Sequence, residues 1–253
     1  MKNLFSVLVL LLFLFTAART QTVDEIIGKY FESIGGTENL KALKTLKMTG
    51  VLPTPQGEFD FELVQKAPNL LKTTLTVMGQ VMVPQAFDGE TGWMLNPFTG
   101  SNKPEKLPEE QTKALKDDAD FDDPFLDYAK KGYAVSYEGT GEVDGIKCFI
   151  LKLIKNKGDA ENEKVSDYYL DCDSYLPLMM KQTAKSGQMA GQEVMIYFSD
   201  YQDAGNGLIR AYTIDSRMGG QSVQMIKFKT IVVNEEVPDE FFKFPGDTAP
   251  VVD

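Results

Sequence analysis

The stretch GEFDFELVQ, residues 57–65, is the clearest indication of the fold class because apolar and acidic side chains alternate along it. Phe59, Phe61 and Leu63 fall on one face of an extended strand, and the acidic residues between them fall on the other. Such alternation is typical of a strand in an antiparallel sheet with one buried face and one face in water.

Comparable segments follow this strand through most of the chain. The turn at residues 67–69 leads into a second alternating strand at 71–77, and glycine-containing turns separate the later segments. Those strand-like segments are 81–87, 92–95, 133–139, 146–154, 165–172, 176–184, 192–202, 207–216 and 221–233. We therefore expect a mainly β fold with added helices (α+β), in which about 11–12 strands form a large curved antiparallel sheet or an open barrel.

Two short helices are predicted before the sheet. Thr22 and Glu25 have the spacing of a capping box, which marks the start of a helix. The pair Gly35-Gly36 ends this helix, and a second one begins at Thr37. The apolar stripe of the first helix consists of Val23, Ile26, Ile27, Tyr30, Phe31 and Ile34. We expect a helical hairpin that covers an apolar surface of the sheet.

Residues 97–131 interrupt the strand pattern. Three prolines lie in the first part of this segment, and residues 109–116 and 122–131 have helix-compatible compositions. We expect a loop with one or two short helices, inserted between strands of a single domain. Long inserts on β scaffolds are often lids or binding elements. The alternative is a surface segment that only covers a sheet edge.

The first twenty residues have the pattern of a secretory signal peptide. Lys2 supplies a positive start, residues 4–15 are apolar, and small residues at 16–18 or 18–20 form a cleavage site. The apolar run is shorter than the roughly 20 residues that span a bilayer; an uncleaved membrane anchor is the alternative. No cysteine lies beside the cleavage site to carry a lipid anchor, so we expect residues 21–253 to form one soluble exported domain.

The composition excludes several kinds of active site. The chain has 26 basic residues, 37 acidic residues, two cysteines and no histidine. Without histidine, no Ser-His or Cys-His catalytic pair and no His-zinc site can form, and two cysteines do not complete a structural zinc site. We therefore expect a protein that is not an enzyme, with no catalytic residue, no metal and no cofactor.

The charge of the expected mature chain restricts its partners. Removal of residues 1–20 leaves 24 basic and 37 acidic residues, a net charge of −13. A surface this acidic repels phosphate backbones and anionic membrane faces. We expect no nucleic-acid partner, no stable membrane insertion, and a monomer.

Cys148 and Cys172 lie in two segments, 146–154 and 165–172, that look like the strands of a hairpin. If paired residue numbers sum to about 320, Cys148 faces Cys172 at a distance that suits a disulfide. Export to an oxidising compartment favours that disulfide, and free buried thiols are the alternative. A shift of one residue in register would place Asp171 opposite Cys148 and remove the disulfide.

The acidic run at residues 117–123 can be compared with an EF-hand calcium loop. In that alignment Asp123 stands where glycine is required, and Ala129 stands where glutamate is required. A solvated run of charges is the better interpretation.

The apolar residues favour a binding surface. Ten methionines remain after residue 20, many of them in strand-like segments that also carry aromatic residues. Methionine is flexible and polarizable, and it recurs at surfaces that repack around varied partners. An open sheet with such a lining can hold an acyl chain; an ordinary filled core is the alternative. The residues expected to line a hydrophobic ligand cavity are Phe59, Phe61, Leu63, Leu75, Val77, Met82, Trp93, Met180, Met195, Tyr197, Tyr212 and Met225.

A set of short motifs runs from the first helix to the C-terminal segment. They are TVDEII at 22–27, LKALKTLK at 40–47, GEVDG at 141–145, YYLD at 168–171, YLP at 175–177 and VPDEFF at 237–242. Over most of residues 22–245, the chain resembles the LolA/LolB-like periplasmic family that sorts outer-membrane lipoproteins (lipoprotein carriers).

The resemblance implies an unclosed antiparallel β-barrel covered by the helical hairpin and the inserted segment. It also implies a soluble carrier in the periplasm of a Gram-negative bacterium, which binds lipid or lipoprotein acyl chains and meets donor and acceptor proteins of the envelope. A non-catalytic envelope scaffold with a filled core is the alternative. Family carriers hold their lid through an arginine on an early strand. That role is not carried over, because no arginine lies between Arg19 and Arg210.

Overall fold

The sheet dominates the structure. The computed structural model describes residues 21–55, 57–100, 102–159, 163–184 and 191–246, so the predicted signal peptide lies outside the described residues. The strands are β1 (Thr45–Thr54), β2 (Gly57–Lys66), β3 (Leu70–Val77), β4 (Gln80–Phe87), β5 (Gly92–Leu95), β6 (Glu105–Lys106), β7 (Ala134–Val143), β8 (Ile146–Lys155), β9 (Lys164–Asp171), β10 (Pro177–Thr183), β11 (Glu193–Asp203), β12 (Ile209–Met218) and β13 (Gln221–Val233).

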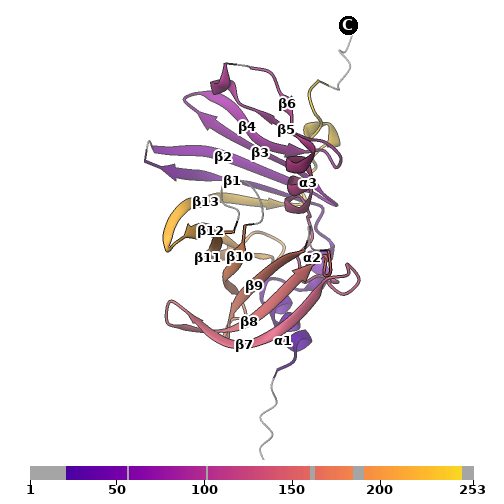
Figure 1. Cartoon of the computed structure of the whole chain (residues 1–253), viewed down its shortest axis with the longest axis vertical. Coiled ribbons are helices and arrows are strands. Elements are labelled where there is room, and N and C mark those ends of the chain that lie inside the picture. Colours follow the sequence, from indigo (N-terminus) through magenta and orange to yellow (C-terminus); the bar gives the residue numbers. More distant parts are fainter. Residues whose placement is uncertain (1–20, 56, 101, 160–162, 185–190, 247–253) are drawn as a thin grey trace, which may run out of the picture.

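These strands form one 13-stranded antiparallel sheet in the order β6-β5-β4-β3-β2-β1-β13-β12-β11-β10-β9-β8-β7 (Figure 1). The two end strands, β6 and β7, do not pair with each other, so the sheet is not closed. The prediction of a mainly β, unclosed architecture is confirmed. The count exceeds the expected 11–12 because two strands were not predicted. β1 is a full strand although it contains Gly50 and Pro53, and β6 has only two residues.

The first and last strands join the two parts of the sheet. β1 pairs with β2 on one side and with β13 on the other, where Met48 lies opposite Ile231. A bulge between Thr49 and Gly50 interrupts the pairing with β13. A side chain at Gly50 would place its Cβ 2.1 Å from the carbonyl oxygen of Lys227, so only glycine fits this close approach.

The helices cover the sheet at two places (Figure 1). Helix α1 (Val23–Ser33) begins with the predicted capping box, and Gly36, with φ of 89°, precedes α2 (Thr37–Lys41). The buried side chains of α1 join one core cluster with residues of β8 and β9. Helix α3 (Glu109–Asp118) packs Leu115 against Leu71 and Phe87 of the other part of the sheet. Within the insert, the second expected helix, at the described residues 122–131, is absent, and residues 124–132 form successive turns.

The C-terminal segment fills the outer part of the sheet, formed by β2–β5. After β13, Val237 and Phe242 pack against Val64 of β2. Trp93 of β5 is 2% exposed, lies 6.3 Å from the ring of Phe244, and donates a hydrogen bond from its indole Nε1 to the carbonyl oxygen of Phe242 at 2.8 Å. The 3-10 helix η3 (Asp239–Phe241) lies in this segment.

The predicted register of the cysteine hairpin is wrong by one residue. Cys148 lies opposite Asp171, and the pairing ends at Lys155 with Lys164. Cys172 follows β9, where its backbone N–H donates to the carbonyl oxygen of Lys147 at 3.0 Å. Both cysteines are free thiols in the structure. Burial, together with the nearby Cys172 and Asp171, raises the pKa of the Cys148 thiol to about 11, which suppresses the reactive thiolate.

Candidate functional site

A pocket of about 410 Å³ lies between the sheet and the helical cover, which consists of α1, α2 and the residues up to Leu43. Its walls come from α1, α2 and the adjoining residues, from residues 121–124 of the insert, and from strands β1, β2 and β9–β13. This volume falls within the range of roughly 300–1,000 Å³ that is usual for sites that hold small molecules.

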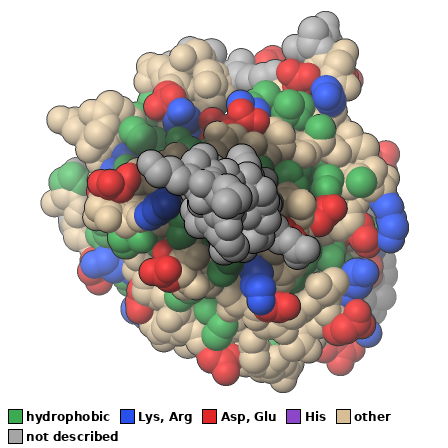
Figure 2. Space-filling model, turned by 90° about the horizontal axis from the view of Figure 1, so that it is seen from below, with side chains coloured by type: hydrophobic (Ala, Val, Ile, Leu, Met, Phe, Trp, Pro, Cys, Tyr) green, Lys and Arg blue, Asp and Glu red, His purple; other side chains and the backbone are tan. Residues whose placement is uncertain are grey.

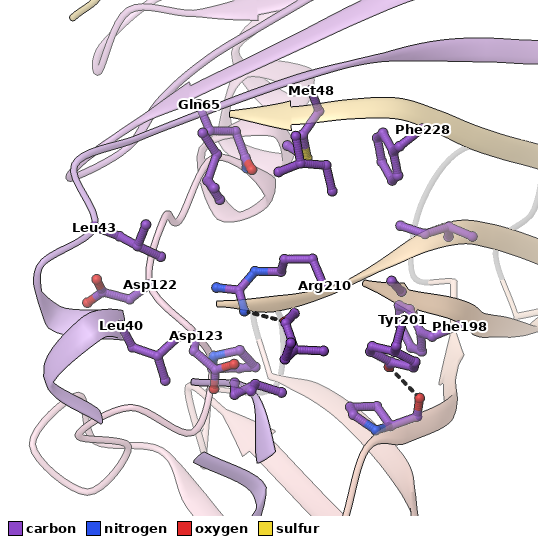
Figure 3. A pocket seen from close by; sticks show the side chains of 18 of the residues that line it. Leu40, Leu43, Met48, Gln65, Asp122, Asp123, Phe198, Tyr201, Arg210 and Phe228 are labelled. Carbon is purple, nitrogen blue, oxygen red and sulfur yellow. Dashed lines mark hydrogen bonds between the residues drawn. The ribbon is translucent and has the colours of Figure 1, made fainter. Parts of the chain in front are cut away.

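Apolar side chains form most of the pocket wall. Leu40 and Leu43 project from the helical cover, while Met48 and Phe228 project from the sheet opposite them (Figure 3). Additional apolar side chains from the strands are Leu46, Leu63, Met180, Phe198, Ile214 and Ile231. Such a lining favours an apolar ligand, because contact with it removes hydrocarbon from water.

One carboxylate is half-buried at the side of the pocket that faces α1. Asp123 accepts a hydrogen bond from the hydroxyl of Tyr30, and it accepts a second from the backbone N–H of Phe125 at 2.9 Å. Burial raises the pKa of Asp123, although both hydrogen bonds and the charge of Arg210 act in the opposite direction. Burial and the adjacent carboxylate raise the pKa of Tyr30, so its hydroxyl remains a donor at neutral pH.

One guanidinium also lines the pocket. Arg210 lies near the start of β12, and its side chain reaches across the space between Gln65 and Asp123 (Figure 3). Its Nη1 donates to the carbonyl oxygen of Ile209 at 3.0 Å. Within the described part of the chain, the structure records no ion pair between Arg210 and a carboxylate. Burial raises the pKa of Asp123, Tyr30 and Tyr201, and the positive charge of Arg210 partly opposes this rise in all three. Arg210 therefore interacts electrostatically with the polar groups of the pocket.

Two more tyrosines supply polar groups to the wall. The hydroxyl of Tyr201 donates to the carbonyl oxygen of Pro177 at 2.5 Å, and this contact is marked in Figure 3. Burial raises the pKa of both Tyr168 and Tyr201. Both hydroxyls are therefore neutral near pH 7.

Two of the residues predicted to line a cavity, Leu63 and Met180, do line this pocket. Phe61 shares the strand face of Leu63 but lies two residues earlier in β2, where its ring centroid is 5.6 Å from that of Phe228. Leu75 and Met82 continue the row from Phe61 across β3 and β4. The pattern of alternation therefore identifies the face of β2, and the pocket occupies only one end of it.

The other predicted residues lie away from the pocket wall. Trp93 is in the filled outer part of the sheet, and Tyr212 is buried in the main core cluster. Met195 and Tyr197 pack near Cys148. The remaining three, Phe59, Val77 and Met225, are half-buried on β2, β3 and β13.

The residues that sequence reasoning did not assign to a site are Tyr30, Asp123 and Arg210. Tyr30 belongs to the predicted apolar stripe of α1, and Asp123 belongs to the acidic run. Arg210 is one of three arginines in the chain, and this rarity is the one sequence signal that could have drawn attention to it. The three meet only because the sheet and the insert bring distant segments together.

The acidic run of the insert forms ion pairs with lysines. Asp117 pairs with Lys164 at 3.0 Å, and Asp122 pairs with Lys131 at 3.1 Å. In the described ranges, no group of three or more acidic or cysteine residues is arranged to hold a metal ion. The insert thus contributes Asp122, Asp123 and their neighbours to the pocket wall, while α3 covers the outer part of the sheet.

The molecular surface carries both signs of charge on the face seen from below. In the part of this face that the structure describes, acidic and basic side chains are interspersed with hydrophobic ones (Figure 2). Neither sign gathers into one large patch there. Within the described residues, no helix has the length and apolar composition needed to cross a membrane.

Comparison with known proteins identifies the fold through structure. No family model matches the chain, and no curated protein matches its sequence. A LolA superfamily protein from Nitrosomonas europaea is similar with a TM-score of 0.56 at 11% identity, covering 88% of this chain and 98% of that one. A DUF1329 family protein from Desulfovibrio piger is similar with a TM-score of 0.56 at 13% identity, with the same two shares covered.

A domain from Vibrio parahaemolyticus, described as an outer membrane lipoprotein-sorting protein domain, is similar with a TM-score of 0.55 at 13% identity. The similarity covers 86% of this chain and 94% of that domain. At these identities the likeness concerns the fold. The chain has a LolA/LolB-like fold, as the resemblance of its sequence motifs predicted.

Proposed function

We propose that this chain is a non-enzymatic carrier that binds the acyl chains of lipids or lipoproteins in the pocket beneath α1 and α2. The observation that carries the proposal is the apolar pocket of about 410 Å³ in a LolA-like fold. The predicted signal peptide and the family resemblance support a location in the periplasm of a Gram-negative bacterium. Its expected role is in the sorting of lipoproteins to the outer membrane.

The energetics of the pocket suit an acyl chain. Each methylene group that leaves water contributes about 0.8 kcal/mol, so a dozen contribute about 10 kcal/mol before other terms. Loss of translational freedom and ordering of the chain offset a large part of this gain. A carrier requires a net affinity that permits both uptake and release, and this offset keeps the affinity below the gross gain.

Polar contacts between the helical cover and the insert define the part that would move to admit a ligand. Tyr30 of α1 donates to Asp123, and the hydroxyl of Tyr128 donates to Asp24 at 3.0 Å. Lys41 of α2 forms an ion pair with Asp127 at 3.7 Å. The polar contacts are few, but Tyr30 also packs against Phe125 and Leu126 in one buried cluster. Exposure of this apolar surface is therefore the main cost of separating the cover from the insert.

Native mass spectrometry of the mature protein tests the proposal. The protein is purified from the periplasm without detergent, and bound material is extracted with organic solvent. A stoichiometric acyl-containing ligand is expected. A mass of the protein alone, unchanged after incubation with phospholipid and with a lipopeptide, would contradict the carrier function and favour a filled-core scaffold.

A matched pair of variants connects binding to this pocket. Ala211 lines the pocket, so Ala211→Trp places a large side chain in the space that the acyl chain would occupy. Val223 is 55% exposed on β13 and provides the control Val223→Trp. Loss of the bound ligand in the first variant alone is expected. Equal occupancy in both variants would place the ligand elsewhere.

A further inference from the structure

The two arginines of the described chain have different surroundings. Arg217 forms an ion pair with Asp215 at 2.6 Å, and its guanidinium lies 4.1 Å from the ring centre of Tyr197. Arg210 lines the pocket, and its recorded hydrogen bond goes to a backbone carbonyl. One guanidinium is therefore neutralised by a carboxylate, and the other presents its charge to an apolar pocket.

The two acidic residues that line the pocket together with Arg210 have other partners. Asp123 receives hydrogen bonds from Tyr30 and from the backbone of Phe125, and Asp122 pairs with Lys131. Within the described residues, no ion pair joins Arg210 to either of these carboxylates. The positive charge of Arg210 thus remains only partly compensated inside the pocket.

The shape of the guanidinium determines which ligand group it can receive. Arginine has five N–H donors in a planar fork, and a carboxylate, sulfate or phosphate can accept two of them in parallel. One recorded hydrogen bond, to Ile209, leaves other donors of Arg210 available for such a pair. A pair of this kind is stronger in an apolar pocket than in water. It also fixes one end of the ligand.

We propose that Arg210 binds the anionic head of an amphiphile whose acyl chain lies against the apolar wall of the pocket. The inference rests on the proposed carrier function and specifies its ligand class: a hydrocarbon chain that carries an acidic group at one end. The apolar wall around Met48, Met180 and Phe228 holds the chain. Arg210 distinguishes an acidic head from a neutral or cationic head.

Displacement of the neutral fluorophore N-phenyl-1-naphthylamine from the mature protein tests this assignment. Dodecanoate carries both chain and acidic head, 1-dodecanol carries the chain with a neutral head, and acetate carries the head alone. Dodecyltrimethylammonium carries the opposite charge. The ratio of the dodecanoate affinity to the dodecanol affinity is measured at pH 8 for the natural protein and for three variants.

The variants separate charge from geometry. Arg210→Met is expected to lower the dodecanoate-to-dodecanol ratio about tenfold, equivalent to about 1.4 kcal/mol, and to improve the relative binding of dodecyltrimethylammonium. Arg210→Lys keeps the charge and loses the fork, so an intermediate ratio is expected. Arg217→Lys makes the same substitution at the paired arginine, and the ratio is expected to stay at its natural value.

The outcomes distinguish this inference from the carrier function on which it rests. If Arg210→Met has the same ratio as the natural protein, the anionic subsite is wrong while the carrier function stands. Displacement by acetate alone would also overturn it, because the recognised ligand would then be a free anion and not an amphiphile. If the natural protein binds neither the fluorophore nor dodecanol, the carrier function fails and the subsite fails with it.

Discussion

The apolar surface is tightly packed in one part of the sheet and borders a pocket in the other. In the outer part, the C-terminal segment fills the surface of β2–β5, and Trp93 is 2% exposed beneath Phe242 and Phe244. In the part beneath α1 and α2, side chains of comparable polarity surround a pocket of about 410 Å³. One continuous sheet therefore provides both a packed core and a binding site, and they lie on opposite faces: the register places Val64 and Trp93 on one face and Leu63 on the other. On the first face the C-terminal segment supplies side chains that fill the space, and on the second the helices leave a pocket.

The largest expected effect concerns the filled part. Trp93→Ala should lower the free energy of unfolding by about 3–5 kcal/mol, because it creates a cavity and removes the hydrogen bond to Phe242. Met180→Ala, in the wall of the pocket, should cost clearly less, since that side chain already borders empty space. Chemical denaturation measures both values. Equal losses would mean that the two parts are packed alike, and Phe98→Ala, at a side chain that is 51% exposed, serves as the control.

The second effect concerns the space in the pocket. Ala211→Trp should lower the affinity for an acyl ligand at least tenfold, about 1.4 kcal/mol, while the free energy of unfolding without ligand changes by less than about 1 kcal/mol. Fluorophore titration and chemical denaturation of the same preparation give the two numbers. A loss of stability as large as that of an overpacked core, with ligand affinity unchanged, would show that the site is filled.

The third effect concerns the cover over the pocket. Thr22→Ala removes the cap from α1, because the Thr22 hydroxyl accepts from the backbone N–H of Glu25 at 3.2 Å. A loss of about 1 kcal/mol is expected, with faster amide hydrogen exchange in α1 than in β2–β5. Thr37→Ala is the matched control, since the N-cap of α2 is Gly36. Similar exchange changes in both parts of the sheet would mean that cover and core open together.

The smallest effect is the pH dependence that Asp123 adds to the pocket region. Its pKa is raised in the folded state, so its contribution to stability is fully present below 3.8 and is lost as the pH rises through the folded-state pKa. Asp123→Asn should remove this contribution, and the stability difference between variant and natural protein should therefore change with pH in the acid range. Tyr30, Arg210 and Lys131 face this carboxyl and remain in both proteins. A difference that is independent of pH would contradict a raised pKa.

The sequence predicted the fold better than it predicted the pocket. The alternation in residues 57–65 and the capping box at Thr22 are local patterns, and the structure confirms both. The strand pattern predicted a curved sheet or an open barrel, and the family resemblance implied the unclosed barrel. Register depends on the geometry of each turn, and an error of one residue was enough to misplace Cys148 relative to Cys172.

The pocket was harder to predict because its polar residues are far apart in the chain. Tyr30, Asp123 and Arg210 come from a helix, an insert and a late strand, and none of the three belongs to a local motif that indicates a site. Alternation does select the correct face of β2, which is why Leu63 was found. It does not show how far along a curved sheet the covering helices extend, so residues nearer the hairpin ends were included as well.

The pairing of β1 with β13 has a consequence for the synthesis and folding of this protein. The hydroxyls of Thr49 and Thr230 are 2.6 Å apart across that pairing, although 181 positions separate them in the chain. During synthesis, the edge of β1 that pairs with β13 therefore has no native partner until nearly the whole chain has emerged. Exposed strand edges attract other chains. A cell that makes this protein must shield that edge for almost the entire time of synthesis, and a premature stop before β13 should yield an aggregating fragment.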